Sequence, residues 1–273
     1  MAAALLPLIV EPAALEAALG TDGLLVVDLN EAPMYAQGHV PGAVNLAYAS
    51  LIGPRPPAMG TIAGPDQLSA ALSGIGLTPD HHVVAYDGEG TGKSSRFLWT
   101  LDVIGHPSFS LLNGGLHSWS AEGHPMETAP TVPAPSDYKV NLGDGAIADK
   151  GYIVSHLDDP GVVVLDARTA AEYTGTDVRA ARGGHIPGAV SLPASGNLNP
   201  DNHFCYLSTQ ALGERASNAN IQPQQRVIAY CGAGIAASQS LFSLYIAGYR
   251  NLALYDASWE EWGTNPANPV ERS

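Results

Sequence analysis

The chain has 273 residues, of which 45% are hydrophobic, and its formal net charge is −14 at pH 7. This composition is typical of a globular protein with room for two ordinary domains, and it excludes a disordered chain. The charge argues against nucleic acid or an anionic membrane as a partner, and two cysteines are too few for a disulfide framework.

The first ten residues are apolar, but they contain no positively charged segment and end at Glu11-Pro12. Such a run is too short for a transmembrane helix and poorly formed for a signal peptide. We therefore expect a cytoplasmic protein, in which a reduced thiol is the normal state.

Short apolar runs alternate with helical patterns along the chain. The first half predicts strands at 24–27, 83–86 and 109–112, with helices around 12–19, 65–72 and 94–104. The second half predicts strands at 162–165, 227–230 and 252–255, with helices around 208–216 and 236–247. This alternation predicts an α/β fold in each half, with a mainly parallel sheet flanked by helices. Ligands bind at the carboxyl ends of strands in such sheets.

The two halves repeat each other. Four pairs of motifs occur in the same order and lie 138, 146, 144 and 143 residues apart, at Asp28 and Asp166, His39 and His185, Asp87 and Cys231, and Trp119 and Trp262. This regular spacing indicates a duplicated domain of ordinary size.

A proline-rich, polar segment separates the repeats and is typical of an extended linker. The predicted boundaries are an N-terminal domain at 1–125, a linker at 126–139 and a C-terminal domain at 140–273. Asp87 occupies the position at which the second half has Cys231. We therefore expect the N-terminal domain to be non-catalytic and the C-terminal domain to be catalytic.

Cys231 lies where an apolar strand meets a glycine-rich turn and a helix of small residues. A thiol in this place faces unpaired backbone N–H groups and the positive end of a helix dipole, which together favour the reactive thiolate. The turn can also stabilise a bound anion. Its residues are Gly232, Ala233, Gly234, Ile235 and Ala236. Cys205 has no such surroundings and is predicted to be structural.

These features together resemble the tandem-domain rhodaneses, which comprise thiosulfate and 3-mercaptopyruvate sulfurtransferases. The resemblance depends on Asp166-Ala167-Arg168, the paired Gly-His motifs, the Cys231 loop and the terminal segment 255–263. It implies that Cys231 takes a sulfane sulfur from a small donor as a persulfide. The acceptor would be thiophilic, such as cyanide, a dithiol or thioredoxin. Loop amides can stabilise a persulfide anion without a metal, so no cofactor is expected.

The sequence of the loop does not decide whether the donor is thiosulfate or 3-mercaptopyruvate. Thiosulfate enzymes of this family usually carry Arg or Lys in the loop, whereas this loop is uncharged and looks more like the Cys-Gly-Ser-Gly-Val-Thr loop of mercaptopyruvate enzymes. Ala233 and Ala236 replace both hydroxyl residues of that loop. The implied Ser-His-Asp relay is therefore incomplete, although His39 and Asp28 match its other members. His39 is expected to hydrogen-bond within its own turn.

An anionic donor requires positive charge, and three arginines lie in the segment before His185. The resemblance implies two donor-binding arginines here, of which the first falls at Glu172 and the second at Arg179 or Arg182. Arg182 is favoured, since a planar guanidinium suits a carboxylate or sulfonate. Arg168 is expected to pair with Asp166 and to support the loop.

Other classes fit less well. Cysteine-dependent phosphatases and arsenate reductases need a longer loop closed by an arginine, which is missing after Ser238. A nucleotide-binding loop is suggested by Gly92-Lys93-Ser94, but Asp87 replaces its required first glycine. A relay or binding module that takes persulfide from a partner protein stays open. We expect a monomer, because the duplication already supplies paired domains.

Overall fold

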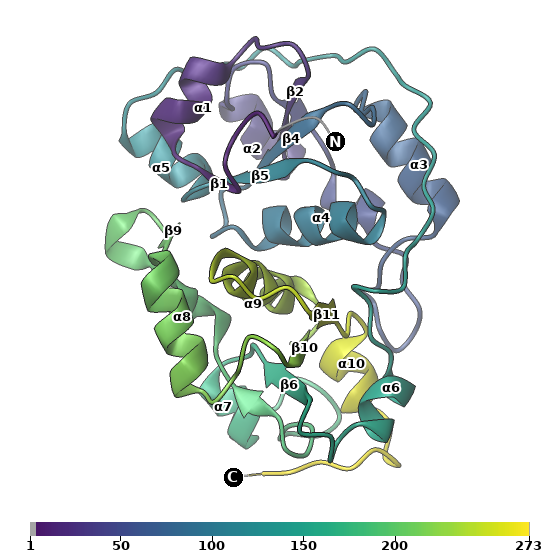
Figure 1. Cartoon of the computed structure of the whole chain (residues 1–273). Helices are drawn as coiled ribbons and strands as arrows, with labels where there is room; N and C mark the ends of the chain where they lie inside the picture. The colour runs from purple at the N-terminus through teal and green to yellow at the C-terminus, as the bar shows by residue number, and fades with distance from the viewer. Residues whose placement is uncertain (1–3, 273) are drawn as a thin grey trace. The chain divides into compact units, whose positions relative to one another are not determined.

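The computed structural model describes residues 4–272, so residues 1–3 of the apolar N-terminal run lie outside the described residues. The chain forms two compact units (Figure 1). Of the described residues, unit 1 contains 4–52, 63–143 and 199–206. Unit 2 contains 53–62, 144–198 and 207–272.

Unit 1 is built on a parallel sheet with the strand order β1-β5-β4-β2-β3. The strands are β1 (Ile9–Val10), β2 (Leu24–Asp28), β3 (Val44–Asn45), β4 (His82–Tyr86) and β5 (Phe109–Leu112). The helices are α1 (Pro12–Ala18), α2 (Ala32–Gln37), η1 (Tyr48–Leu51), α3 (Pro65–Gly74), α4 (Gly92–Val103) and α5 (Gly115–Ala121). Every residue of β4 is buried, which explains its continuous apolar run as a central parallel strand.

Unit 2 has a parallel sheet with the strand order β11-β10-β6-β7. The strands are β6 (Val162–Asp166), β7 (Val190–Ser191), β10 (Arg226–Tyr230) and β11 (Leu252–Leu254). The helices are α6 (Lys150–Ser155), α7 (Ala170–Thr174), η2 (Ala194–Asn197), α8 (Thr209–Asn218), α9 (Ile235–Ile246) and α10 (Ser258–Trp262). Between these elements in the chain, β8 (Leu198–Asn199) and β9 (Cys205–Tyr206) form a separate two-stranded sheet and flank the short helix η3 (Pro200–Asn202). Residues 199–206 of this segment belong to unit 1.

The predicted fold class is confirmed, since both sheets are parallel and flanked by helices. The order β5-β4-β2-β3 in unit 1 is repeated by β11-β10-β6-β7 in unit 2. The corresponding tryptophans, Trp119 and Trp262, are both fully buried in the core of their unit. Helix α4 packs on β4 and β5, and α9 packs on β10 and β11. The repeat in the sequence is therefore a repeat in the structure.

The units do not follow a single cut in the chain. Residues 53–62 come from the first half of the sequence but belong to unit 2, and residues 199–206 come from the second half but belong to unit 1. The backbone N–H of Tyr206 donates to Asn113 Oδ1 at 2.9 Å, which anchors the second segment. The expected linker packs along unit 1, where the Tyr138 N–H donates to Ser73 Oγ at 2.9 Å. Local sequence patterns did not indicate this exchange of segments.

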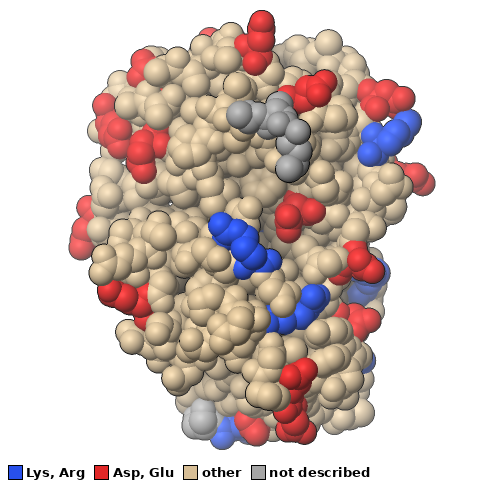
Figure 2. Space-filling model, viewed as in Figure 1, with Lys and Arg blue, Asp and Glu red and all other residues tan. Residues whose placement is uncertain are grey.

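Acidic side chains are spread over the face shown in Figure 2, with few basic side chains among them. This distribution agrees with the net charge of −14. Within residues 4–272, no helix combines the length and apolarity needed to cross a membrane.

Candidate active site

Cys231 directly follows β10 and lies just before α9, with 4% of its surface exposed. Gly234 caps α9 in a left-handed conformation (φ 88°), which a glycine adopts without strain. This turn directs the Gly234 N–H at Cys231 Sγ, and the two atoms are 3.0 Å apart. The sulfur thus accepts a backbone hydrogen bond at the N-terminus of a 12-residue helix, whose dipole favours negative charge there.

Helix α10 holds the backbone of the loop. The Cys231 N–H donates to Ser258 Oγ at 3.1 Å, and the Cys231 carbonyl accepts from the Trp259 N–H at 2.9 Å. The Gly232 carbonyl accepts from the Glu260 N–H at 3.2 Å. The carbonyls of Cys231 and Gly232 therefore both accept hydrogen bonds from α10. The N–H groups in the first turn of α9 have no partner within the helix. The sequence analysis did not single out Ser258, although it lies in the terminal motif that carries the family resemblance.

The segment 53–62 packs directly against the Cys231 loop within unit 2. A Cβ atom added to Gly60 would lie 2.3 Å from the Ala233 carbonyl oxygen, so only glycine fits at this position. Two carboxylates of the α10 region fix the segment: Glu260 accepts from the Met59 N–H and Asp256 from the Ile62 N–H, each at 2.7 Å. The sequence analysis missed this wall of the loop, because no local pattern links residues so far apart in the chain.

Arg168 and Asp166 form a buried ion pair behind the loop. Arg168 Nη2 lies 2.6 Å from Asp166 Oδ2, and its Nε donates to Asp166 Oδ1 at 3.0 Å. Burial alone would lower the pKa of Arg168, but the hydrogen bonds and charge of Asp166 raise it above its ordinary value. The guanidinium also stacks over Trp259 at 4.4 Å, and the Tyr230 hydroxyl donates to Asp166 at 2.6 Å. With these partners the guanidinium of Arg168 does not offer an open anion site.

The contacts of Arg182 differ from those expected of a residue that binds the donor. Its guanidinium donates to four backbone carbonyls, at Trp262, Gly263, Asn265 and Asn268. Because four of its five N–H groups are engaged, Arg182 holds the chain after α10 and has little capacity left for a substrate.

Arg179 and Glu172 lie at the surface of unit 2. Arg179 Nε donates to Asp177 at 2.9 Å, and its side chain is 69% exposed. Glu172, at the position where the resemblance implies an arginine, forms a capping box with Thr169 at the start of α7. This capping box explains a carboxylate at position 172, because the carboxylate accepts from the Thr169 N–H, which has no partner within the helix.

His39 and Asp28 belong to unit 1. His39 is fully buried, stacks on Tyr35 with ring centroids 3.7 Å apart, and its Nδ1 lies 2.8 Å from the Tyr35 carbonyl. His185 repeats this arrangement on Tyr173, at 3.7 Å and 2.9 Å. Asp28 is also fully buried, and burial raises the pKa of its carboxyl. The two histidines therefore share one geometry, in which each ring stacks on a tyrosine of its own unit.

The loop of unit 1 encloses the carboxylate of Asp87. One oxygen accepts from the N–H groups of Glu89 at 2.8 Å and Thr91 at 2.9 Å. The other accepts from the N–H and the hydroxyl of Ser94, at 2.8 and 2.9 Å. The first turn of α4 thus binds an anion that the protein itself supplies. The strand–turn–helix arrangement is therefore able to hold negative charge at this place.

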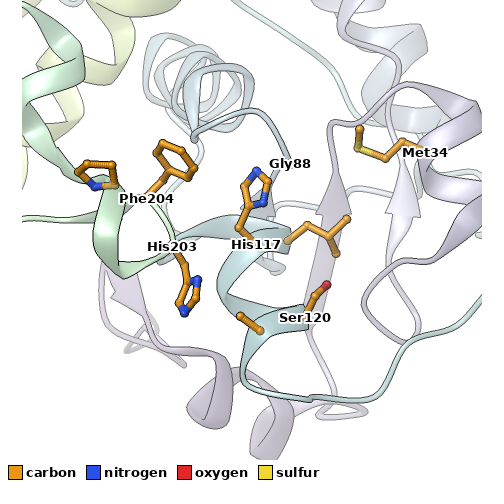
Figure 3. A pocket seen from close by; sticks show the side chains of 9 residues that line it. Met34, Gly88, His117, Ser120, His203 and Phe204 are labelled. Carbon is orange, nitrogen blue, oxygen red and sulfur yellow. The ribbon is translucent and has the colours of Figure 1, made fainter.

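A hollow of about 520 Å³ opens beside the Asp87 loop in unit 1 (Figure 3). Figure 3 shows His117, on α5, between Phe204 and Gly88, and its ring centroid lies 5.5 Å from that of Phe204. The residues that line the hollow are Met34, Gly88, Leu116, His117, Ser120, Ala121, Pro200, His203 and Phe204. These side chains include no nucleophile comparable to Cys231.

Cys205 is the second thiol of the chain. It is buried in β9, and burial, followed by the charges of Glu11 and Glu122, raises the pKa of its thiol to about 11. The thiol therefore stays protonated at neutral pH, which makes it a poor nucleophile.

Comparison with known proteins identifies the family. The model of the rhodanese-like domain matches twice, at residues 11–122 and 150–265. The chain is 36% identical to the thiosulfate sulfurtransferase of Azotobacter vinelandii and 35% identical to that of Pseudomonas aeruginosa, covering 97% of each chain in both cases. The protein therefore belongs to the rhodanese family. It is a tandem member, and these full-length relatives are sulfur-group transferases.

Solved structures show the same fold at lower identity. The Tum1 protein of Saccharomyces cerevisiae is 23% identical, with a TM-score of 0.85 over 97% of this chain and 99% of the other. An anaerobic ergothioneine biosynthesis enzyme of Chlorobium limicola is 21% identical, with a TM-score of 0.82 over 92% of this chain. The match spans only 65% of that enzyme. These likenesses concern the fold alone.

Proposed function

We propose that the protein transfers a sulfane sulfur from thiosulfate to a thiophilic acceptor through a persulfide on Cys231. The observation that carries this proposal is the hydrogen bond from the Gly234 N–H to Cys231 Sγ at the N-terminus of α9. It supplies a positive environment for a sulfur anion. The thiosulfate sulfurtransferases at 35–36% identity support thiosulfate as the donor.

The reaction proceeds in two displacements. The Cys231 thiolate attacks the outer sulfur of thiosulfate, the S–S bond of the donor breaks, and its electron pair leaves with sulfite. The persulfide anion that forms is stabilised by the Gly234 N–H and the first turn of α9. An acceptor such as cyanide then attacks the terminal sulfur, thiocyanate leaves, and the Cys231 thiolate is restored. A covalent intermediate of this kind gives ping-pong kinetics.

The uncharged loop supports 3-mercaptopyruvate as a second donor. Attack of the thiolate on its sulfur breaks the C–S bond and releases the enolate of pyruvate, which takes up a proton. The persulfide is the same for both donors. Ala233 and Ala236 offer no hydroxyl for proton transfer, so we expect the proton to come from solvent.

Steady-state transfer to cyanide, with thiosulfate and 3-mercaptopyruvate as separate donors, tests the proposal. Cys231→Ser is expected to lose activity by about 10³-fold or more, because the nucleophile is removed. Cys205→Ser serves as the matched control and should keep wild-type activity. Mass spectrometry after thiosulfate treatment should show one added sulfur atom on the wild type and none on Cys231→Ser.

The absence of turnover with both donors, in a folded and reduced sample, would contradict the proposal. The persulfide relay would then become the better hypothesis. Its test is transfer of labelled sulfur to Cys231 from a persulfidated partner protein.

A further inference from the structure

A small anionic donor meets an unfavourable charge environment in this protein. Thiosulfate is a dianion, whereas the chain carries a net charge of −14 and acidic side chains are spread over the face in Figure 2. Two carboxylates, Glu260 and Asp256, also lie beside the Cys231 loop, where they fix the segment 53–62. An anion that approaches Sγ therefore needs a nearby cation to offset this repulsion.

The two arginines predicted for donor binding are engaged elsewhere, since Arg182 is held by four carbonyls and Arg179 is paired with Asp177 at the surface. Arg168 is paired with Asp166. Arg226 is the first residue of β10 and so lies at the opposite end of the five-residue strand that leads to Cys231, about 17 Å away. Arg250 precedes β11 at that same distant edge.

Arg55 lies in the segment that forms the wall of the loop. The segment folds back on itself, since the Gly53 N–H donates to the Thr61 carbonyl at 2.8 Å and the Arg55 N–H donates to the Ala58 carbonyl at 2.8 Å. Arg55 Nε then donates to Thr61 Oγ1 at 3.1 Å. This bond fixes the plane of the guanidinium, while the residue as a whole is exposed. Across residues 4–272, no hydrogen bond or ion pair engages its Nη1 or Nη2.

The turn brings this guanidinium near the catalytic loop. Thr61, which holds Arg55, is the neighbour of Gly60, and Gly60 packs against the Ala233 carbonyl two residues after Cys231. The contact is so close that a Cβ on Gly60 would collide with the loop backbone. The segment and the loop are therefore fixed to each other within unit 2, with Glu260 bonded to both through the Met59 and Gly232 backbones.

We propose that Arg55 binds the anionic group of the sulfur donor, by Nη1 and Nη2, while Cys231 attacks the sulfane sulfur. The planar pair of N–H groups suits two oxygens of a sulfonate or a carboxylate. Arg55 is therefore a specificity-determining residue for donors that carry such a group. This inference rests on the proposed function, and it places the positive charge of the site on the wall of the loop.

The first experiment compares donors with and without an anionic group. Arg55→Gln should raise the KM for thiosulfate by about 10-fold or more, as expected for losing hydrogen bonds to a charged group. The kinetic parameters with an uncharged donor, dimethyl trisulfide, should stay unchanged. Arg55→Lys should restore part of the loss. Arg250→Gln, which removes the same charge from the distant edge, is the matched control and should leave both donors unaffected.

An unchanged KM for thiosulfate in Arg55→Gln would overturn the inference. An equal loss with both donors would also overturn it, because Arg55 would then serve only to hold the loop.

A second experiment separates this inference from the proposed sulfur transfer. Binding of thiosulfate to Cys231→Ser is measured by tryptophan fluorescence, which needs no turnover. The added change Arg55→Gln should weaken this binding by about 10-fold or more. Equal binding by both variants, or no binding by Cys231→Ser, would overturn the role of Arg55. The proposed function fails on a separate observation, namely absence of turnover by the wild type.

Discussion

The loops of the two units show how one backbone arrangement serves two purposes. In unit 1, the Asp87 carboxylate accepts four hydrogen bonds from its own loop and the first turn of α4. In unit 2, Cys231 Sγ accepts one from Gly234, which leaves the first turn of α9 available to a bound anion. The same strand–turn–helix arrangement thus binds a carboxylate of the protein itself in one unit, and in the other it holds the sulfur that we propose to react.

A second difference lies at the end of the neighbouring strand. Asp166 pairs with Arg168 in unit 2. The equivalent carboxylate in unit 1, Asp28, accepts from the Asn30 N–H at 2.6 Å and has no arginine at that position. Burial therefore raises the pKa of the Asp28 carboxyl. The unit that carries the thiol therefore has an ion pair at this strand end, formed by Asp166 and Arg168. In the other unit the uncharged Asn30 stands in place of the arginine.

The largest expected effect on stability comes from breaking the charged network. Arg168→Met should cost about 3–5 kcal/mol of unfolding free energy, because Asp166 stays buried without its partner. The matched change in unit 1, Asp28→Asn, should cost about 1 kcal/mol or less, since no cation depends on that carboxyl. Urea unfolding of both variants measures the difference, and equal losses would contradict the comparison.

Removing the carboxylate of the unit 1 loop should have the next largest effect. Asp87→Ala leaves buried N–H groups of Thr91 and Ser94 without their acceptor, at an expected cost of about 2–3 kcal/mol. Cys231→Ser should change stability by about 1 kcal/mol or less, although it is expected to abolish transfer. Thermal unfolding and a transfer assay, measured on both variants, check whether Asp87→Ala loses stability and Cys231→Ser loses activity. A variant Asp87→Ala as stable as the wild type would show that the loop does not need its anion.

The third prediction concerns a feature that both units share. Glu127 accepts from the Gly42 N–H at 2.9 Å, and Glu271 accepts from the Gly188 N–H at 3.0 Å. Glu127→Ala and Glu271→Ala should therefore cost similar amounts, about 1 kcal/mol each. Urea unfolding tests this equality, and a large difference would show that the Gly-His turns have diverged as the loops have.

The smallest expected effect is a pH dependence specific to unit 1. His82 is buried with Nδ1 and Nε2 at 2.6 and 2.7 Å from Ser108 Oγ and Ser110 Oγ. Burial, followed by the charge of His106, lowers the pKa of His82 from 6.5. The unfolded chain therefore takes up the proton first, so stability is complete above about pH 6.5 and falls as the pH drops through the lower folded pKa.

Thermal unfolding between about pH 7.5 and pH 5.5 measures this dependence. His82→Gln should flatten it, whereas His117→Gln, at an exposed site, should not. A slope unchanged by His82→Gln would assign the pH dependence to other groups.

Local patterns in the sequence predicted the elements and the position of Cys231, because apolar runs, glycine turns and strand ends are short-range signals. The contacts around the loop depend on distant residues and were not predictable in this way. The sequence favours Arg182 for donor binding, because no local pattern indicates its carbonyl partners, which come after α10. The Glu127 and Glu271 pair was detectable, because its spacing of 144 residues equals that of Asp87 and Cys231.

The exchange of segments between the units affects how the protein is made. Synthesis on the ribosome is vectorial, and unit 1 lacks residues 199–206 until well after its own sheet has emerged. Until then Asn113 has no Tyr206 backbone to accept from, and Thr91 lacks the Tyr206 hydroxyl that lies 3.3 Å away in the finished fold. Unit 1 therefore completes its packing only when about three quarters of the chain has been translated, and its last contacts depend on a segment from the second half.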